Sequence, residues 1–332
     1  MNEVIKLAVI GSGKWGMNHI RTAYELIGDN LKYVCDIDVS NENKVKEISK
    51  TIKFTTILDD VLKDKDINSV IIATPAETHF EVSKRCLDHD KHVLVEKPIT
   101  LVSGDAKVLV DLADAKDKRL MVGHVLLYHP AIVKIKKMLN NGRLGMLQYI
   151  YSNRLNLGTV RSEENILWSF APHDISIMQY LTGNNPINVS AKGAVFLQND
   201  IEDTTLTFLE YPDNVHAHIF VSWLHPFKEH RLLVIGDKGM LVFEDSLKDD
   251  KLKYYEKGYH KVNGVLEKFD NEYEVVKIDT RQPLAEEQKH FFDCVIKGKK
   301  PLTNGVHAVE VLEILEKAQK SLKLPTKSGQ EL

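Results

Sequence analysis

Residues 4–20 read VIKLAVIGSGKWGMNHI, and residues 31–38 read LKYVCDID. The first stretch is an apolar run that ends in a turn with three glycines and continues with a helical pattern. The second stretch is another apolar run, and Asp36 closes it. A strand, a glycine-rich turn, a helix and a second strand form a βαβ unit when they follow one another in this order. This part of the chain is therefore predicted to form parallel strands with a helix between them.

Each glycine of the turn has a separate physical role. Gly11 allows the tight turn out of the strand, Gly13 lets a diphosphate reach the backbone amides, and Gly16 lets the helix pack closely on the strand. The phosphates would then lie at a helix N-terminus, where unpaired N–H groups and the helix dipole favour negative charge. Asp36 lies about 20 residues after the last glycine, where an acid accepts hydrogen bonds from ribose hydroxyls. The pattern predicts a dinucleotide site, and a glycine turn in an unrelated βαβ unit is the alternative.

The residues after Asp36 favour NAD over NADP. Ile37 and Asp38 follow it, so no Arg or Lys is at hand to receive a 2′-phosphate. The carboxylate of Asp36 would also repel that phosphate. The cofactor predicted from this stretch is therefore NAD.

Length, charge and cysteine content narrow the class of protein. A chain of 332 residues is expected to form two domains, at about 100–200 residues per domain. The net charge of −3 gives no reason to expect nucleic acid or a membrane surface as a partner, so the ligand is predicted to be a small molecule. The three cysteines are far apart and form no paired motif, which is typical of reduced thiols in the cytoplasm. Histidine spacing gives no metal-binding motif, so no metal is expected.

Hydrophobic patterning divides the chain into two parts. Residues 1–125 alternate short β-rich runs with amphipathic stretches, which predicts an NAD-binding Rossmann domain whose doubly wound parallel sheet has helices on both faces. Residues 126–332 contain longer strands that alternate apolar and polar positions, which predicts an open and mainly antiparallel sheet. The predicted fold class is thus α/β, with a second domain that binds substrate. We also expect a homodimer or homotetramer that forms through this second sheet.

Motifs along nearly the whole chain resemble those of the Gfo/Idh/MocA oxidoreductases, named after glucose-fructose oxidoreductase and inositol dehydrogenase. They are VIGSGKWGMNHI, VCDID, VIIATPAETHFEV, KHVLVEKPIT, HPAIVKIKKMLNNGRLG and PLTNGVHAVEVLEIL. The resemblance implies a Rossmann domain, a second α/β domain with an open sheet, and nicotinamide-dependent oxidation or reduction of sugars and cyclitols. The predicted cofactor-binding residues are Gly11, Ser12, Gly13, Lys14, Trp15, Gly16, Asp36, Thr74, Pro75, His79, Glu96 and Lys97.

Lys97 and His173 are the predicted catalytic residues. Lys97 follows the apolar run VLVE at the carboxyl end of a predicted parallel strand, where ligands bind in doubly wound sheets. A partly desolvated lysine beside a positive nicotinamide can act as a base for a secondary alcohol, and the family has its lysine here. The resemblance assigns His173 to the histidine that shares the proton transfer. We expect both to meet at the same alcohol, and a solvated charge at a strand end is the alternative for Lys97.

Charged residues near His173 are candidates for substrate recognition. Asp174 either orients the imidazole or a sugar hydroxyl, or caps a helix predicted to start close to it. Arg154 and Arg161 suit a phosphate or carboxylate, although arginines on a surface are the alternative. The predicted substrate-binding residues are Lys97, Arg154, Asn156, Arg161, His173 and Asp174.

The segment NRLNLG followed by WSFAPHDIS resembles family members that oxidise UDP-N-acetylglucosamine or its uronic acid at carbon 3. It departs from a common family pattern, because Ser169 and Ser176 stand where many members have Asp. The predicted function is an NAD-dependent dehydrogenase that acts on a secondary alcohol of a nucleotide-linked sugar. The alternatives are an inositol or free-sugar dehydrogenase, a reductase of a dTDP-linked keto sugar, and a protein that senses NAD(H) without turnover.

Overall fold

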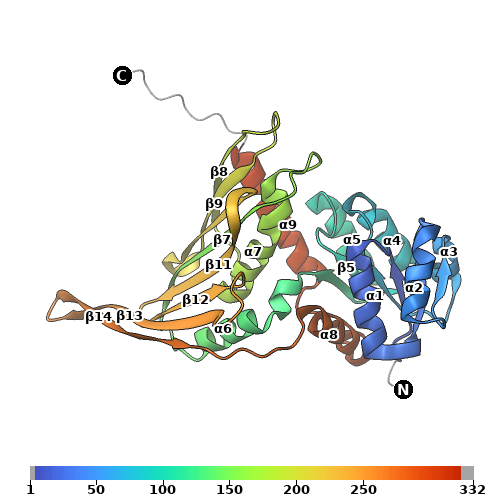
Figure 1. Cartoon of the computed structure of the whole chain (residues 1–332), viewed down its shortest axis with the longest axis horizontal. Helices are drawn as coiled ribbons and strands as arrows, with labels where there is room; N and C mark the ends of the chain where they lie inside the picture. The colour runs from blue at the N-terminus through green and yellow to red at the C-terminus, as the bar shows by residue number, and fades with distance from the viewer. Residues whose placement is uncertain (1–3, 323–332) are drawn as a thin grey trace. The chain divides into compact units, whose positions relative to one another are not determined.

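The computed structural model describes residues 4–322, and within them the chain folds as two compact units (Figure 1). The first unit contains residues 4–128 and Arg281–Leu312. The second contains His129–Thr280 and residues 313–322. Of the helices in these described segments, none is both long and apolar enough to cross a membrane.

The first unit includes a segment that the sequence places in the second domain. Helix α8 (Pro283–Lys297) packs on α1 (Lys14–Ile27) and on the turn Val125–Tyr128. After α8, the backbone N–H of Val122 donates to the carbonyl of Thr303 at 2.8 Å. The chain therefore returns to the first unit, so the units differ from the expected contiguous domains 1–125 and 126–332. Residues 323–332 of the expected second domain lie outside the described residues.

The described part of the first unit contains a six-stranded, all-parallel sheet in the order β3-β2-β1-β4-β5-β6. Its strands are β1 (Leu7–Ile10), β2 (Leu31–Cys35), β3 (Lys53–Thr55), β4 (Ser69–Ile72), β5 (His92–Glu96) and β6 (Leu120–Gly123). Every residue of β1, β4 and β6 is buried, as expected for strands with helices on both faces. The predicted doubly wound Rossmann sheet is confirmed.

The connections of this sheet explain where its ligand site lies. The strand order runs one way from β1 to β3 and the other way from β4 to β6, so right-handed crossovers place helices on opposite faces. The order reverses between β1 and β4, and ligands bind at the carboxyl ends of the strands next to such a reversal. Besides α1, the helices between these strands are α2 (Glu42–Ile48), α3 (Leu58–Lys63), α4 (His79–Asp88) and α5 (Ser103–Ala115).

The second unit is built on an eight-stranded sheet in the order β14-β13-β12-β11-β7-β10-β9-β8. Its strands are β7 (Leu147–Leu157), β8 (Asn188–Ala194), β9 (Thr204–Glu210), β10 (His216–Ser222), β11 (Leu224–Gly236), β12 (Met240–Glu244), β13 (Leu252–Val262) and β14 (Val265–Val275). Strands β7 and β10 pair in parallel, and the other neighbours pair antiparallel. The predicted open, mainly antiparallel sheet is confirmed.

Within the described residues, helices cover one face of this sheet and leave the other open. Helix α7 (Ile166–Thr182) packs on β7, β9 and β10, and α6 (Pro130–Asn140) packs on α7. Strand β10 alternates accordingly, because Ala217, Ile219 and Val221 are buried while the residues between them are only partly buried. The helix α9 (Gly305–Leu322) completes the described elements.

Strands β13 and β14 form a long hairpin that the sequence interpretation does not include (Figure 1). The turn between them is Asn263-Gly264, with φ of 52° and 86°. Positive φ at both central residues is what a two-residue hairpin turn of the primed type requires, and Asn-Gly is its preferred sequence. The turn signal was therefore present in the sequence.

Candidate active site

The glycine turn at the end of β1 has the geometry that a diphosphate requires. Gly11 has φ of +95°, and a Cβ there would lie 2.6 Å from the carbonyl oxygen of Ala73. A Cβ on Gly16 would collide with the carbonyl oxygen of Gly11. Around Gly13, in contrast, an added Cβ would meet no described atom within 4 Å, and the first turn of α1, which the structure describes in full, has no acidic side chain. The turn thus leaves open space beside an uncovered helix N-terminus, which fits a bound diphosphate.

Asp36 lies beside this turn, at the end of β2. Its Oδ2 accepts hydrogen bonds from the backbone N–H of Ser12 at 2.5 Å and from the Ser12 hydroxyl at 2.7 Å. Its Oδ1 accepts the N–H of Asp38 at 2.9 Å. An ionised carboxylate has about four acceptor positions, so it can also accept from a ribose hydroxyl. Asp36 and Ser12 therefore fit the cofactor-binding role predicted for them.

His79 connects the loops that follow β4 and β5. Its Nδ1 lies 2.7 Å from the carbonyl oxygen of Pro98, and its Nε2 lies 2.9 Å from that of Thr74. The ring is only 1 % exposed. Both ring nitrogens are thus directed at the backbone, so His79 holds the loop containing Thr74 and Pro75 close to the residue after Lys97. Its predicted contact with the cofactor would accordingly be indirect.

Lys97 follows β5, and the carboxylate of Glu96 lies beside it. Glu96 Oε1 accepts hydrogen bonds from Trp15 Nε1 at 2.6 Å and from His19 Nε2 at 2.8 Å, and Oε2 accepts the backbone N–H of Lys97 at 3.2 Å. A Cβ on Gly123 would lie 2.9 Å from Oε1, so the glycine makes room for the carboxylate. Burial raises the pKa of Glu96, but the hydrogen bond and electrostatic interaction with His19 and the hydrogen bond from Trp15 outweigh burial and bring the pKa below its usual value. Glu96 is thus held as an anion.

The side chain of Gln288 determines which nitrogen of His19 carries the proton. Gln288 Nε2 donates to the carbonyl oxygen of His19 at 3.2 Å and lies 3.0 Å from His19 Nδ1. The carbonyl can only accept, so the amide presents its N–H groups on this side and Nδ1 acts as an acceptor. Nε2 then carries the proton and donates a hydrogen bond to Glu96. His19 and Gln288 are both fully buried, and neither was among the predicted site residues.

Glu287 also lies on α8 and is fully buried. Neither of its carboxyl oxygens has a hydrogen-bond partner among residues 4–322. Burial raises its pKa well above the usual value, and the charge of Glu96 raises it further. The sequence carried a signal for this position, because Glu287, Phe291 and Val295 are spaced by four along one face of α8 and all are buried.

His124 of the first unit lies near Lys97, and His307 packs against His124. The rings of His124 and His307 meet edge to face with centroids 5.2 Å apart. Burial lowers the pKa of His124 well below its usual value, and the charges of His307 and Lys97 add to this effect. Burial also lowers the pKa of His307 to about 4. Both rings are therefore neutral near pH 7, and His307 was not among the predicted site residues.

His173 and Asp174 lie in the second unit, in the middle of α7. The helix begins at Ile166, and the side chain of Asn165 caps it by accepting the N–H of Trp168 at 3.2 Å. The cap therefore lies about two helical turns before Asp174. The alternative that Asp174 caps the helix is wrong.

Asp174 instead forms a buried ion pair with Arg154 of β7. Arg154 Nε donates to Oδ2 at 2.8 Å and Nη2 donates to Oδ1 at 3.1 Å, while the hydroxyl of Ser152 donates to Oδ1 at 2.6 Å. Burial lowers the pKa of the neighbouring His230 to about 4, and the charge of Arg154 contributes. The structure thus joins two predicted substrate-binding residues to each other, and the charge of Arg154 is already balanced.

The remaining substrate candidates of the second unit are placed differently. Arg161 is 55 % exposed at its side chain, and its Nη1 lies 3.0 Å from Glu164 Oε1. The side-chain oxygen of Asn156 is buried without a hydrogen-bond partner in the described chain. Arg161 therefore keeps the accessibility that binding of an anionic substrate needs, whereas Arg154 does not. Their roles in substrate binding stay predictions.

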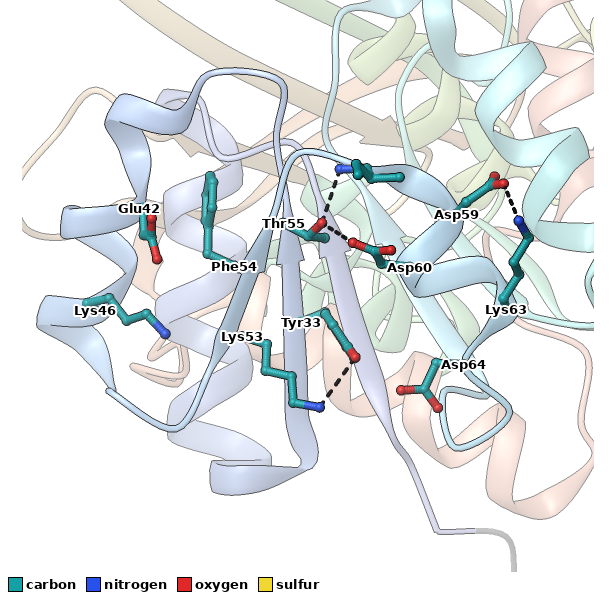
Figure 2. Close-up of a pocket in the computed structure, with 11 residues that line it drawn as sticks. Tyr33, Glu42, Lys46, Lys53, Phe54, Thr55, Asp59, Asp60, Lys63 and Asp64 are labelled. Atoms are coloured by element: carbon teal, nitrogen blue, oxygen red, sulfur yellow. Dashed lines mark hydrogen bonds and ion pairs between the residues drawn. The ribbon is translucent and has the colours of Figure 1, made fainter.

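A wide hollow of about 890 Å³ lies at another place, along the edge strand β3 (Figure 2). Figure 2 shows that several of its polar side chains pair with one another, since Lys63 pairs with Asp59 at 2.8 Å and the Thr55 hydroxyl donates to Asp60 at 2.5 Å. One end approaches the cofactor residues, because the N–H of Asp36 donates to the carbonyl of Thr55 at 3.1 Å. These internal contacts and the open shape of the hollow make it a weaker ligand site than the glycine turn. Among the described residues, no group of three or more His, Cys, Asp or Glu side chains could hold a metal ion.

Two family models match the chain in succession. The oxidoreductase family model with an NAD-binding Rossmann fold matches residues 5–124, and the GFO/IDH/MocA C-terminal domain model matches residues 132–242. The chain belongs to the Gfo/Idh/MocA family. The predicted resemblance is thereby confirmed, and the first unit contains an NAD-binding Rossmann domain of an oxidoreductase.

Relatives within the Gfo/Idh/MocA family include proteins that act on cyclitols. The scyllo-inositol 2-dehydrogenase (NAD(+)) of Bacillus subtilis is 24% identical, over 95% of this chain and 93% of its own. The inositol 2-dehydrogenase of Salmonella typhimurium is 24% identical, over 71% and 73% of the two chains. Among solved structures, UDP-N-acetylglucosamine 3-dehydrogenase GnnA of Acidithiobacillus ferrooxidans has a TM-score of 0.82 at 24% identity, over 95% of this chain and 96% of its own. The last similarity shows a shared fold.

Membership of the Gfo/Idh/MocA family does not by itself account for the buried residues His19, Gln288 and Glu287 close to Glu96 and Lys97. His19, Gln288 and Glu287 come from two helices that are far apart in sequence, and they meet because α8 returns to pack on α1. No motif of local spacing could indicate this contact. Of these features, only the burial of Glu287 on the apolar face of α8 could be predicted from the sequence.

Proposed function

We propose that the protein is an NAD-dependent dehydrogenase that oxidises a secondary alcohol of a sugar or sugar-like substrate. The observation that supports this most strongly is the placing of three features on one parallel sheet. The glycine turn, Asp36 and Lys97 follow β1, β2 and β5, at the carboxyl ends where ligands of such sheets bind. A cofactor site and a candidate base thus occur on the same edge of the sheet.

The nicotinamide ring, when bound, accepts a hydride from the carbon that carries the hydroxyl. In the proposed reaction Lys97 takes the proton of that hydroxyl. The role of His173 in the second unit stays a prediction. The alcohol then loses one hydride and one proton, which balances its conversion to a ketone. Gly13 and the N-terminus of α1 would bind the diphosphate, and Asp36 would bind the adenosine ribose.

We propose that the substrate is a nucleotide-linked sugar such as UDP-N-acetylglucosamine, and that the hydroxyl at its carbon 3 is oxidised. Residues 153–158 and 168–176 support this choice, because they resemble family members that oxidise UDP-N-acetylglucosamine or its uronic acid. The accessible guanidinium of Arg161 supports it as well. A free cyclitol is the second candidate. It is favoured by the ion pair of Arg154 with Asp174, which leaves less positive charge for a phosphate, and by the inositol dehydrogenases among the relatives.

A substrate panel separates these candidates. The purified protein is incubated with NAD or NADP and with nucleotide-linked sugars, free sugars or inositols, and reduced nicotinamide is followed by absorbance. The assay is repeated with 2-oxoglutarate, in case the cofactor stays bound and must be reoxidised in place. Turnover with a nucleotide-linked sugar supports the proposal, and turnover with inositol alone supports the second candidate. Binding of NADH without turnover of any substrate would indicate the sensor.

Replacement of Lys97 tests the proposed chemistry. We expect Lys97→Ala to lower kcat by at least about 10²-fold, because general-base assistance contributes about 10²–10⁴-fold. The Kd for NAD, measured by fluorescence titration, should change little. The exposed Lys50 provides the matched variant Lys50→Ala, which should keep full activity. Unchanged kcat in Lys97→Ala would remove Lys97 from the mechanism.

We also propose that the protein is a homo-oligomer that assembles through the open face of the second sheet. Leu206 is 47 % exposed there, and on the same face His218 stacks on Tyr151 with ring centroids 5.0 Å apart. Exposed apolar and aromatic side chains on a broad sheet favour association. Light scattering should show a dimer or tetramer that Leu206→Glu dissociates, whereas Val133→Glu on the exposed side of α6 should not. A monomeric wild type would contradict the proposal.

A further inference from the structure

Two glutamates of the first unit have opposite polar surroundings. Glu96 accepts hydrogen bonds from Trp15, from His19 and from the backbone of Lys97. Glu287 is fully buried, and in the described structure its two oxygens accept none. A carboxyl that receives several N–H groups is held ionised, whereas a buried carboxyl that receives none is held neutral. The two side chains therefore differ in charge although they influence each other electrostatically.

We propose that Glu96 is a positioning residue for Lys97, and that Glu287 carries a proton so that a single negative charge acts on this lysine. The proposal rests on the base role proposed above for Lys97. Lys97 gains one positive charge when it takes the proton of the alcohol, and one anionic carboxylate balances that charge. A second anion nearby would stabilise the ammonium further and oppose release of the proton.

Glu96 also links Lys97 to the cofactor turn. Trp15 lies in the first turn of α1, two residues after Gly13, and its indole N–H donates to the same oxygen that receives His19. The backbone N–H of Lys97 donates to the other oxygen. One carboxylate thus connects the cofactor-binding turn with the strand end that carries the lysine. His19 contacts Gln288 and donates to the Glu96 carboxylate, and this holds the carboxylate in place.

The charged and titratable side chains at and around Glu96 and Glu287 come from several elements. They are His19 on α1, Glu96 and Lys97 at the end of β5, His124 after β6, Tyr128 in the turn Val125–Tyr128, Glu287 and Cys294 on α8, and His307 on α9. Burial keeps His124 and His307 neutral and keeps the Tyr128 hydroxyl protonated, because it lowers the pKa of both imidazoles and raises the pKa of the phenol. Glu96 with the His19 that donates to it, Lys97 and Glu287 remain as the groups whose charge matters here.

The protonation of Glu287 is tested without cofactor or substrate. A carboxyl whose pKa is raised in the folded state contributes its full stabilisation below its unfolded pKa, and this contribution is lost as the pH rises toward the folded pKa. Glu287→Gln removes this titration, so the Tm of the variant minus that of wild type should increase steadily from pH 5 to pH 8. Glu286→Gln is the matched control. Glu286 pairs with Arg281 and Lys289 at 2.9 Å, so its loss should not stabilise the protein.

The positioning role of Glu96 is tested by kinetics and by NAD binding. Glu96→Gln keeps the shape but removes the charge, so we expect kcat to fall about tenfold or more, with Kd for NAD within about threefold of wild type. The acidic limb of the kcat/KM profile should move to lower pH, because an ammonium that has lost a nearby anion is easier to deprotonate. Trp15→Phe removes one donor to Glu96 and should give a smaller fall in kcat. Glu287→Ala should lower kcat, and Glu287→Gln should recover most of that loss.

These outcomes separate the two assignments. A Tm difference for Glu287→Gln that does not vary between pH 5 and pH 8 would overturn the neutral assignment of Glu287. An acidic limb that stays in place in Glu96→Gln would overturn the positioning role of Glu96. Full activity of Lys97→Ala would instead refute the proposed function, and the Tm measurement on the protein without ligand would still decide the state of Glu287.

Discussion

Each unit holds a carboxylate next to a residue that is predicted to bind or react with the substrate, but the two carboxylates are stabilised in different ways. In the first unit Glu96 accepts hydrogen bonds from the side chains of Trp15 and His19 and from the backbone N–H of Lys97. In the second unit Asp174 accepts two hydrogen bonds from the cationic Arg154, at 2.8 and 3.1 Å. The environment of Glu96 therefore retains a negative charge, whereas Arg154 cancels that of Asp174.

This difference separates charge that acts on a ligand from charge that holds the fold. Uncharged donors such as the Trp15 indole and the backbone N–H of Lys97 stabilise an anion but leave its field to act on neighbours such as Lys97. A guanidinium that pairs with a buried carboxylate joins β7 to α7 and leaves little field outside the pair. Substitution of Asp174 should therefore affect stability first, and substitution of Glu96 should affect catalysis first.

The largest effect on stability is expected from Asp174→Asn. Removal of one partner leaves Arg154 buried without a counter-charge, which costs about 3–5 kcal/mol of the free energy of unfolding. Urea denaturation of wild type and variant measures this difference. Ser152→Ala is the control, because it removes only one hydrogen bond to Asp174 and should cost about 1 kcal/mol.

A double variant sharpens the same prediction. Replacement of both partners by apolar residues, Arg154→Met with Asp174→Leu, removes the unpaired charge and should recover most of the lost stability. A loss below about 1 kcal/mol in Asp174→Asn would mean that water reaches Arg154, and the contrast between the units would fail.

A smaller effect, about 1.4 kcal/mol or tenfold, is expected from Asp36→Ala in the first unit. Asp36 accepts only backbone and hydroxyl groups, from Ser12 and Asp38, so its charge remains available to repel a 2′-phosphate. The ratio of kcat/KM for NAD to that for NADP should fall by this factor. Asp38→Ala is the control, since Asp38 caps the next turn by accepting the N–H of Ser40. An unchanged ratio would remove Asp36 from cofactor selection.

Much of the first unit was predictable because its signals are local. The apolar run of β1, the glycines after it and the acid at the end of β2 each require a particular residue at a particular place, as the positive φ of Gly11 shows. Lys97 was also predictable, because it follows a buried strand at the edge where ligands bind. Both conclusions depend on neighbours in the sequence, and a single sequence contains that information.

Contacts between distant segments were not predictable in the same way. The pairing of Gln288 with His19 depends on how α8 returns to the first unit. The pairing of Arg154 with Asp174 depends on how β7 and α7 pack on each other. Neither contact leaves a pattern in the residues next to it along the chain, so only the folded structure reveals it.

The start of α7 is a local feature that the sequence interpretation nevertheless misplaced. The structure begins the helix at Ile166 with its cap at Asn165, whereas the interpretation puts the start near His173. Proline is common in the first turn of a helix, so Pro172 favours the later start. In the structure Pro172 lies inside α7, and the earlier cap at Asn165 decides where the helix begins.

The hairpin of β13 and β14 shows a third case. Its turn signal, Asn263-Gly264, is clear, but the strands beside it are mostly exposed and rich in charge, so they lack the alternation that indicates a half-buried strand. Glu287 was missed for the opposite reason. Its burial on the apolar face of α8 could be predicted from the sequence. A functional role could not be predicted, because it depends on the electrostatic interaction with Glu96, which only the folded structure shows.

The smallest effect on stability, and the one that tests the substrate, is expected from Arg161→Ala. Arg161 is exposed and pairs with Glu164 at 3.0 Å, so its removal should change the free energy of unfolding by less than about 0.5 kcal/mol. Its counter-charge is 29 % exposed, unlike the buried partner of Arg154, so the guanidinium can turn to a phosphate. If the substrate is a nucleotide-linked sugar, KM for that substrate should rise about tenfold while kcat is kept, because the lost contact is the same in ground and transition states.

Glu164→Ala is the matched control for this prediction, since it removes the partner of Arg161 and leaves the guanidinium to the substrate. Its KM should stay the same or fall, because the arginine no longer divides its hydrogen bonds between Glu164 and the substrate. A KM that is unchanged in Arg161→Ala would mean that no phosphate binds at this position. The second unit would then hold its charges for the fold alone, and the cyclitol would become the better candidate substrate.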